Sequence, residues 1–388
     1  MTIDWIALAG AAAGFFFSAA LPFLTLRPNR ILEGAPLGIL EALGPGAVLI
    51  LGALTAAAAL SVLRERRPAL DTAGSLVSGA GLASLLPLAG AAADRLAGTS
   101  SIARVSAGPG LWLAAAGLGI ALFSFTRRLP SNSPGRLIST LLVPAAALAA
   151  ALAGTLDSLS LVRELVSRRD SYLAELSRHL ALAAGSAALG SGIGVPLGLA
   201  MHSRPRWRGA ISVIVSAAQV VPTLSLLGLL IVPMAALGSA VPFLGRLGVR
   251  GVGWAPAFLV LFLYALLPIA GNTFSALGAV EPGALDAARG MGMSRPQAFR
   301  RVQAPLALPV ILAGIRTAFT ANMGNAVLAA LVGGGGLGTL VFLGLAQAAP
   351  DLILLGALSV SGLALAADRV LALAFRLAVS RGIRPEGS

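Results

Sequence analysis

Glu281-Pro-Gly-Ala-Leu-Asp-Ala-Ala-Arg-Gly-Met-Gly-Met-Ser-Arg-Pro-Gln-Ala-Phe-Arg-Arg-Val-Gln-Ala-Pro305 is a polar, cationic stretch between two long apolar runs. Pro282 suits a first helical position after a carboxylate that can cap it, and Gly292 can end the helix. Ser294 and Gln297 have the spacing of a capping box, which begins a second helix. The stretch therefore predicts two short helices joined at a glycine, held in water beside a membrane and suited to docking a protein partner.

The composition is that of an integral membrane protein. Mean hydropathy is +0.89 and only 11% of the 388 residues are charged. The chain has no cysteine, which excludes disulfides and thiolate metal sites. All 28 basic residues are arginine, so the chain lacks the lysine that a P-loop ATPase needs. Excess arginine in such a protein indicates cytoplasmic loops and contact with membrane lipid, and we expect no nucleic acid partner.

Long apolar runs predict an all-α polytopic fold, because a spanning helix needs about 20 apolar residues. Arginine placement predicts that both termini and residues 281–305 are cytoplasmic. The ten predicted spans are Trp5–Leu26, Pro45–Leu63, Thr72–Ala93, Gly110–Thr126, Leu137–Thr155, Leu180–Met201, Ile211–Met234, Trp254–Ala276, Leu306–Leu331 and Leu352–Phe375.

The chain also divides by composition. Residues 1–155 form a five-span N-terminal extension with few polar groups beyond Ser and Thr. Residues 156–178 are charged with apolar residues at helical spacing, which predicts an amphipathic linker on the periplasmic surface. Residues 179–376 place Pro, Gly, Asn and Gln inside spans, which indicates the working half, and 377–388 form a cytoplasmic tail.

The docking stretch resembles the cytoplasmic coupling loop of binding-protein-dependent ABC importer permeases. Asp286-Ala287-Ala288 corresponds to the opening Glu-Ala-Ala triplet, Gly292 has the family spacing, and Val302–Pro305 corresponds to the closing element. Asp replaces Glu in the triplet and Ala304 replaces Leu, so the charge and a small apolar contact are kept.

Three further segments, Gln219–Ser225, Leu263–Thr273 and Leu331–Gly338, resemble the osmoprotectant branch of this family, and the resemblance covers roughly residues 175–376. It implies that the last five spans form a type I ABC importer permease core in a bacterial inner membrane. It further implies a chain without catalytic residues or cofactor of its own, which imports glycine betaine, choline or a related compound during osmotic stress. The implied partners are an ATPase subunit that binds ATP and Mg, a periplasmic binding protein, and a second permease chain in a homodimer or heterodimer.

The resemblance also implies two sets of site residues. Those of the ATPase-coupling loop are Glu281, Asp286, Ala287, Ala288, Gly292, Ser294 and Pro305. Those of the translocation pathway or gate are Gln219, Pro222, Tyr264, Asn272, Asn325, Gly333 and Gly336. For the polar members of the second set, hydrogen bonding between helices is an equally good explanation.

Two arginines and two histidines lie outside these sets. A cation on the path would repel a quaternary ammonium, so we expect Arg316 to pair with backbone carbonyls or to snorkel to the cytoplasm. We expect Asp368 and Arg369 to neutralise each other. His179 and His202 have no ligand-spaced neighbours, so no metal site is expected.

Three alternatives stay open on the sequence. An ion-driven secondary transporter would need intramembrane carboxylates, and no acid falls in the middle of a predicted span. An ABC permease for another small solute, such as an amino acid, and a membrane scaffold without transport activity are the others.

Overall fold

The structure is a computed structural model that describes residues 3–29, 32–62, 68–98, 100 and 102–378. Of the predicted cytoplasmic tail, residues 379–388 lie outside this range. The chain forms two compact units, residues 1–167 and residues 168–388. Each unit is described by itself.

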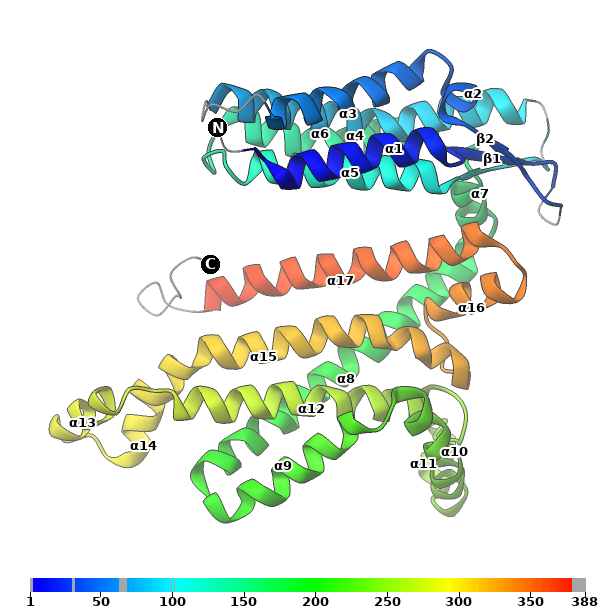
Figure 1. Cartoon of the computed structure of the whole chain (residues 1–388). Helices are drawn as coiled ribbons and strands as arrows, with labels where there is room; N and C mark the ends of the chain where they lie inside the picture. The colour runs from blue at the N-terminus through cyan, green and yellow to red at the C-terminus, as the bar shows by residue number, and fades with distance from the viewer. Residues whose placement is uncertain (1–2, 30–31, 63–67, 99, 101, 379–388) are drawn as a thin grey trace. The chain divides into compact units, whose positions relative to one another are not determined.

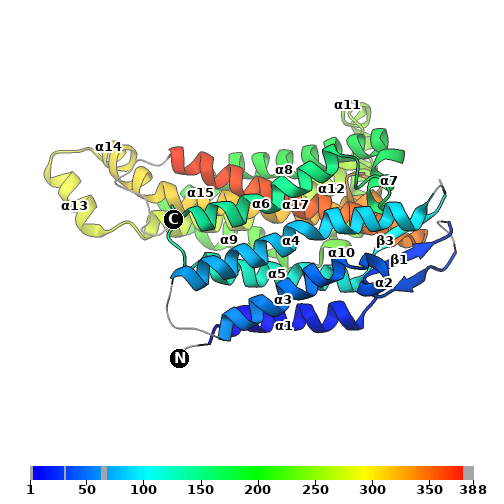
Figure 2. The same ribbon diagram turned by 90° about the horizontal axis from the view of Figure 1, so that it is seen from above.

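The first unit is a helical bundle with a small sheet at one end (Figure 2). Apolar, Ala-rich sequence forms its helices, and the small side chains let them pack closely. Its elements are α1 (Trp5–Ala20), β1 (Leu24–Arg27), β2 (Ala35–Leu37), α2 (Ile39–Leu43), α3 (Gly46–Val62), α4 (Pro68–Ala97), β3 (Arg104–Ala107), α5 (Pro109–Thr126), α6 (Pro134–Leu152) and α7 (Ser160–Ser167).

The sheet was not predicted, and it shortens the first span. β1 is the central strand and pairs antiparallel with both β2 and β3. Helix α1 ends at Ala20 rather than Leu26, because Leu21 before Pro22 is extended, with φ −108° and ψ 157°. The strands are only three or four residues long, too short for sequence alternation to reveal them.

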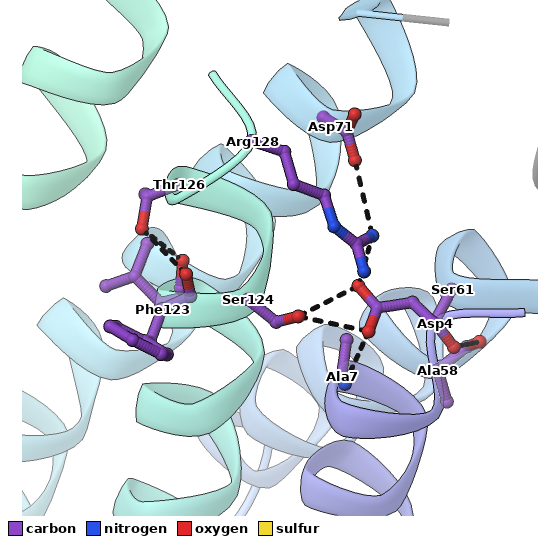
Figure 3. A network of polar contacts seen from close by, with 10 residues as sticks. Asp4, Ala7, Ala58, Ser61, Asp71, Phe123, Ser124, Thr126 and Arg128 are labelled. Atoms are coloured by element: carbon purple, nitrogen blue, oxygen red, sulfur yellow. Dashed lines mark hydrogen bonds and ion pairs between the residues drawn. The ribbon is translucent and has the colours of Figure 1, made fainter. Parts of the chain in front are cut away.

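A polar network ties the start of the first unit to the end of α5 (Figure 3). The Asp4 carboxylate is buried, accepts hydrogen bonds from the Ala7 amide at 3.1 Å and the Ser124 hydroxyl at 2.9 Å, and pairs with Arg128 at 2.5 Å. Asp71 of α4 lies 3.9 Å from the same guanidinium. The network therefore joins α1, α4 and α5 at one end of the bundle.

The second unit contains the docking stretch and long helices that pack against one another (Figure 1). Its elements are α8 (Arg169–Ser203), α9 (Pro205–Val220), α10 (Thr223–Ala240), α11 (Pro242–Arg246), α12 (Trp254–Gly278), α13 (Pro282–Gly290), α14 (Arg295–Ala298), the π-helical η1 (Phe299–Gln303), α15 (Ala304–Asn325), the 3-10 helix η2 (Ala326–Val332), α16 (Gly338–Ala346) and α17 (Pro350–Ala378).

Glycines at helical spacing bring α8 against α12. A Cβ at Gly190, Gly194 or Gly198 would lie within 3 Å of atoms of α12. Small residues one turn apart permit this close approach between membrane helices. Helix α12 is consequently the most enclosed of the long helices of this unit, with α15 on another side.

Eight helical segments in the described parts of the chain are long and apolar enough to cross a membrane, and α1 and α3 are shorter apolar helices. The prediction of an all-α polytopic protein is therefore confirmed. The predicted span Ile211–Met234 is wrong, because the helix breaks at Val221 into α9 and α10. The following Pro222 favours an extended Val221, which has φ −79° and ψ 126°.

The predicted linker, residues 156–178, is not one amphipathic helix but contains one helix and the start of another. Residues 160–167 form α7, and α8 already begins at Arg169, eleven residues before the predicted span at Leu180. The second part of residues 156–178 is thus continuous with the helix that contains the predicted span Leu180–Met201. Its location on the periplasmic surface stays a prediction.

Candidate functional site

The docking stretch forms a knob beyond the ends of α12 and α15 (Figures 1 and 2). Helix α13 ends at Gly290, and Gly292 adopts the left-handed region with φ +80°, which turns the chain. Ser294 then caps α14, and its amide donates to Oε1 of Gln297 at 2.8 Å in a capping box. The two predicted short helices and the predicted capping box are therefore present.

The predicted cap at the start of α13 is wrong. Glu281 occupies the N-cap position, but its side chain makes no capping hydrogen bond among the described residues, and its carbonyl accepts from the Ala284 amide at 3.1 Å. Pro282 at the first helical position has no N–H, so this helix start has one fewer amide that needs a hydrogen-bond acceptor. The Glu281 carboxylate is left exposed.

The triplet Asp286-Ala287-Ala288 exposes one charged and one small side chain to solvent. Asp286 is 69% exposed and pairs with Arg289 at 2.9 Å, one helical turn away. Ala287 is exposed, whereas Ala288 is fully buried. A pair this exposed contributes little stability, so Asp286 is free to exchange Arg289 for a partner's cation.

Polar side chains fix the knob to the membrane helices at its base. Nε2 of Gln303 in η1 donates to the Leu277 carbonyl of α12 at 3.1 Å and lies 3.1 Å from Nε2 of His202 at the end of α8. From Gln303 the chain runs without a break through Pro305 into α15. The base of the knob is thus attached to α8, α12 and α15.

Three of the predicted pathway residues come together at the break between α9 and α10. Nε2 of Gln219 donates to the Tyr264 carbonyl at 3.0 Å, and the Tyr264 hydroxyl donates to the Val221 carbonyl at 2.6 Å. Pro222 lies at the break itself. These bonds hold the interrupted helix against α12, as the interhelical interpretation expects, and a role in the gate stays a prediction.

The other predicted pathway residues lie in separate places. Asn272 lines a hollow of about 400 Å³ with Arg208 and Ser212, and it also lies against Gly314, where a Cβ would be 2.7 Å away. Asn325 is half-buried at the end of α15. Their roles stay predictions.

The glycine run forms a tight turn between η2 and α16. Gly333, Gly335 and Gly336 all have positive φ, which other residues rarely adopt. The Gly336 amide donates to the Glu175 carboxylate of α8 at 2.5 Å. A Cβ at Gly336 would meet Nδ1 of His179 at 3.2 Å, so this turn is pinned to α8 at two successive turns of that helix.

Among the described residues, Arg316 pairs with Asp368 and not with the backbone carbonyls that we predicted. Arg369 attracts the Asp368 carboxylate electrostatically, but the direct partner of Asp368 is Arg316. Nε and Nη2 of Arg316 donate to Oδ1 and Oδ2 of Asp368 at 2.5 and 2.6 Å. The packing of α15 against α17 brings the two side chains together in this bidentate pair. The sequence did not reveal the pair, because Arg369 is the arginine next to Asp368 along the chain. Asp368 thus lies within α17, inside the predicted span Leu352–Phe375, and its partner is on a different helix.

The two histidines are structural. His179 is fully buried, and its Nε2 donates to the Met323 carbonyl at 2.9 Å. His202 contacts Gln303, as described above. The described residues contain no group of three or more side chains suited to hold a metal ion.

Sequence reasoning missed two polar contacts of this unit. Asn322 was noted only as one of several intramembrane amides, yet its Nδ2 donates to the Ser186 hydroxyl at 2.9 Å and the Leu261 carbonyl at 3.0 Å, which ties α15 to α8 and α12. The contact of Glu175 with the glycine turn was also missed, because Glu175 is one of several charged residues in the predicted linker. The one signal that could have found it was its spacing of one turn from His179.

Comparison with known proteins gives two family matches. Residues 190–384 match the family described as "Binding-protein-dependent transport system inner membrane component". Residues 4–162 match "ABC transporter permease YehY, N-terminal domain".

Curated relatives and a solved structure each match just over half of the chain. The chain is 36% identical over 212 residues to "Glycine betaine/carnitine/choline transport system permease protein OpuCB" of Bacillus subtilis (strain 168), covering 55% of this chain and 90% of the relative. It is 38% identical over 219 residues to "Osmoprotectant import permease protein OsmW" of Salmonella typhimurium, covering 55% of this chain and 94% of that one. A structure titled "Inward facing conformations of the MetNI methionine ABC transporter" is 25% identical, covers 54% of this chain and 96% of its own, and has a TM-score of 0.44.

The first family match extends over half of the chain, from within α8 to beyond α17, and contains the knob, the glycine turn and the Arg316–Asp368 pair. The relatives agree with it over nearly their full lengths. The chain therefore belongs to the family of binding-protein-dependent transport system inner membrane components and is a multi-pass inner-membrane permease subunit of an ABC transporter.

Proposed function

We propose that this permease imports a quaternary ammonium osmoprotectant such as glycine betaine, choline or carnitine. One observation carries the proposal: two osmoprotectant permeases match this chain over 90% and 94% of their own lengths. Each of those relatives matches 55% of this chain. The substrate class of this chain follows from theirs.

Energy enters through the knob, which acts as the coupling loop of residues 281–305. ATP and Mg bind to a separate ATPase subunit, since this chain has no lysine for a phosphate loop. Exposed Asp286 and Ala287 contact that subunit, and Gly292 sets the angle between α13 and α14. When the ATPase closes, η1 passes the displacement to α15, and the Gln303 contacts pass it to α12 and α8. The pathway then alternates between inward and outward access.

The remaining partners and the orientation follow from the same scheme. A periplasmic binding protein delivers the substrate at the face opposite the knob, and a second permease chain completes the pathway. Both termini and the knob are cytoplasmic, in agreement with arginine placement. In this scheme residues 1–155 are an N-terminal extension, residues 156–178 link it to the permease core 179–376, and 377–388 are the tail.

The test is reconstitution in liposomes of the complex that contains this chain, an ATPase subunit and the binding protein. We expect ATP hydrolysis that rises when the binding protein carries glycine betaine, together with ATP-dependent uptake. Uptake that needs an ion gradient and no ATP would instead establish a secondary transporter. Calorimetry with the binding protein separates the substrates, and tight binding of an amino acid without any betaine binding would assign another solute.

A further inference from the structure

An ion pair between α15 and α17 lies open to its surroundings inside the membrane-spanning part of the chain. Arg316 and Asp368 make the bidentate contact described above, yet their side chains are 40% and 27% exposed. Arg316 lies twelve residues after Ala304, or roughly 18 Å along α15 at 1.5 Å per residue. That distance is more than half the thickness of a hydrocarbon core of about 30 Å.

A hollow of about 520 Å³ adjoins this pair. Its walls are small or polar side chains of α15 together with the carboxylate of α17, and they are Ala313, Arg316, Thr317, Thr320, Ala321 and Asp368. The hydroxyl of Thr320 is buried and has no hydrogen-bond partner among the described residues. The volume falls within the range of small-ligand sites, about 300–1,000 Å³.

The face that carries Arg316 and Asp368 is unsuited to contact with lipid. Charged side chains within spans are costly in hydrocarbon and almost always face a wet path or a protein interior. An ion pair that served only to lock two helices together would add little stability, because desolvation offsets the attraction. A lock would also not need an adjoining hollow with an unsatisfied hydroxyl. The combination indicates a site that receives a polar molecule.

The geometry points to a transit site for zwitterions, and we infer that α15 and α17 bind the substrate there on its way through the pathway. This inference rests on the proposed function. Asp368 engages Nε and Nη2 of Arg316, so Nη1 lies outside the pair and can donate to a substrate carboxylate. The Asp368 carboxylate attracts the substrate's ammonium end, and the Thr320 hydroxyl donates to the carboxylate end.

The paired charges define the substrate class. A lone arginine on the path would repel an onium compound, but the adjacent carboxylate removes the net charge of the site. A zwitterion with an onium group and a carboxylate satisfies both charges, as in glycine betaine or carnitine. Choline lacks the carboxylate and leaves the Arg316 donor without a partner. The site therefore favours zwitterions over simple cations.

The test replaces both charges at once by apolar residues of similar volume, Arg316→Met with Asp368→Leu. Such a change leaves no unpaired charge, so insertion and helix packing are kept or improved. The complex is reconstituted with its ATPase and binding protein, and two quantities are measured. One is ATP hydrolysis stimulated by the loaded binding protein, and the other is binding of radiolabelled glycine betaine to the permease–ATPase complex without binding protein.

We expect the double variant to keep stimulated ATP hydrolysis but to lose betaine binding by roughly tenfold to a hundredfold, as expected for lost charge-assisted hydrogen bonds. Thr320→Val should weaken binding by roughly threefold to tenfold. The matched control is Thr55→Val on α3, a threonine of an apolar helix whose hydroxyl donates to a carbonyl four residues earlier, and it should change nothing.

Betaine binding and uptake within about twofold of the unaltered complex in the double variant would overturn the site and leave a plain structural pair. Equal binding of choline and betaine by the unaltered complex would overturn the preference for zwitterions. If the unaltered complex itself shows no ATP-dependent uptake, the proposed function fails instead, so the two failures are distinguishable. Should the double variant not insert, Thr320→Val alone decides, since unchanged betaine binding there contradicts the site.

Discussion

Replacement of Gly292 by valine tests the coupling loop with a single backbone angle. Gly292 has φ +80°, and a Cβ at this position would meet nothing within 4 Å. The whole effect of a side chain is therefore backbone strain and not a clash. A residue forced into this region costs about 1–3 kcal/mol, and a β-branched residue belongs at the upper end. At about 2 kcal/mol the observed turn is populated roughly thirtyfold less.

The assay is the affinity of the purified permease for its ATPase subunit in nanodiscs, measured beside betaine uptake. We expect Gly292→Val to weaken ATPase binding by roughly tenfold to a hundredfold and to reduce uptake in parallel, with normal insertion. Gly292→Asn should recover much of the loss, because asparagine tolerates the left-handed region.

Gly290→Ala is the matched control. Gly290 lies two residues earlier in the same knob, is helical, and also has open space around its Cβ position. Alanine there should be neutral or slightly favourable for α13. Normal ATPase binding by Gly292→Val, or an equal loss in Gly290→Ala, would refute the reasoning from the turn.

Three further perturbations address other parts of the molecule. Asp4→Asn should lower the stability of the first unit by about 2 kcal/mol, since it weakens bonds to a charged group, and a lower thermal midpoint relative to the exposed control Asp157→Asn would register it. Gly336→Ala places a side chain on a residue with φ +91°, which costs about 1–3 kcal/mol, and should reduce uptake while ATPase binding stays normal. Gly324→Ala, in a helix with open space around the Cβ position, should leave uptake unchanged. Asn322→Leu removes two interhelical hydrogen bonds and should lower thermal stability by about 1–2 kcal/mol in a permease that still binds its ATPase, and an unchanged midpoint would speak against the tie.

Sequence reasoning was strongest where one local rule determines one local structure. The apolar runs predicted the helices, and the capping box at Ser294 and the glycine at 292 predicted the knob. Local rules could not supply contacts between distant segments. The Arg316–Asp368 pair joins residues 52 apart, and only the packing of α15 on α17 brings them together. Asp368 was assigned to its neighbour Arg369 because adjacency is the only proximity a sequence displays.

The remaining differences have equally specific causes. Pro222 ended a helix inside an uninterrupted apolar run, where hydropathy alone predicts one span from 211 to 234. Two of the three short strands of the first unit, β1 and β3, pair across a long sequence separation. Glu175 gains its role only because the glycine turn at 333–336 folds back onto α8. The break at Pro222 follows from a local preference that hydropathy does not register. For the sheet and Glu175, tertiary contact determines the outcome.

Residue 291 offers the most direct test of the account, because the chain contains no cysteine and Met291 at the tip of the knob is 70% exposed. A Met291→Cys variant is treated in intact cells with a membrane-impermeant maleimide, and again after the membrane is made permeable. A coupling loop that meets a cytoplasmic ATPase predicts labelling only after permeabilisation, and protection when the ATPase is bound. Labelling in intact cells would contradict the account.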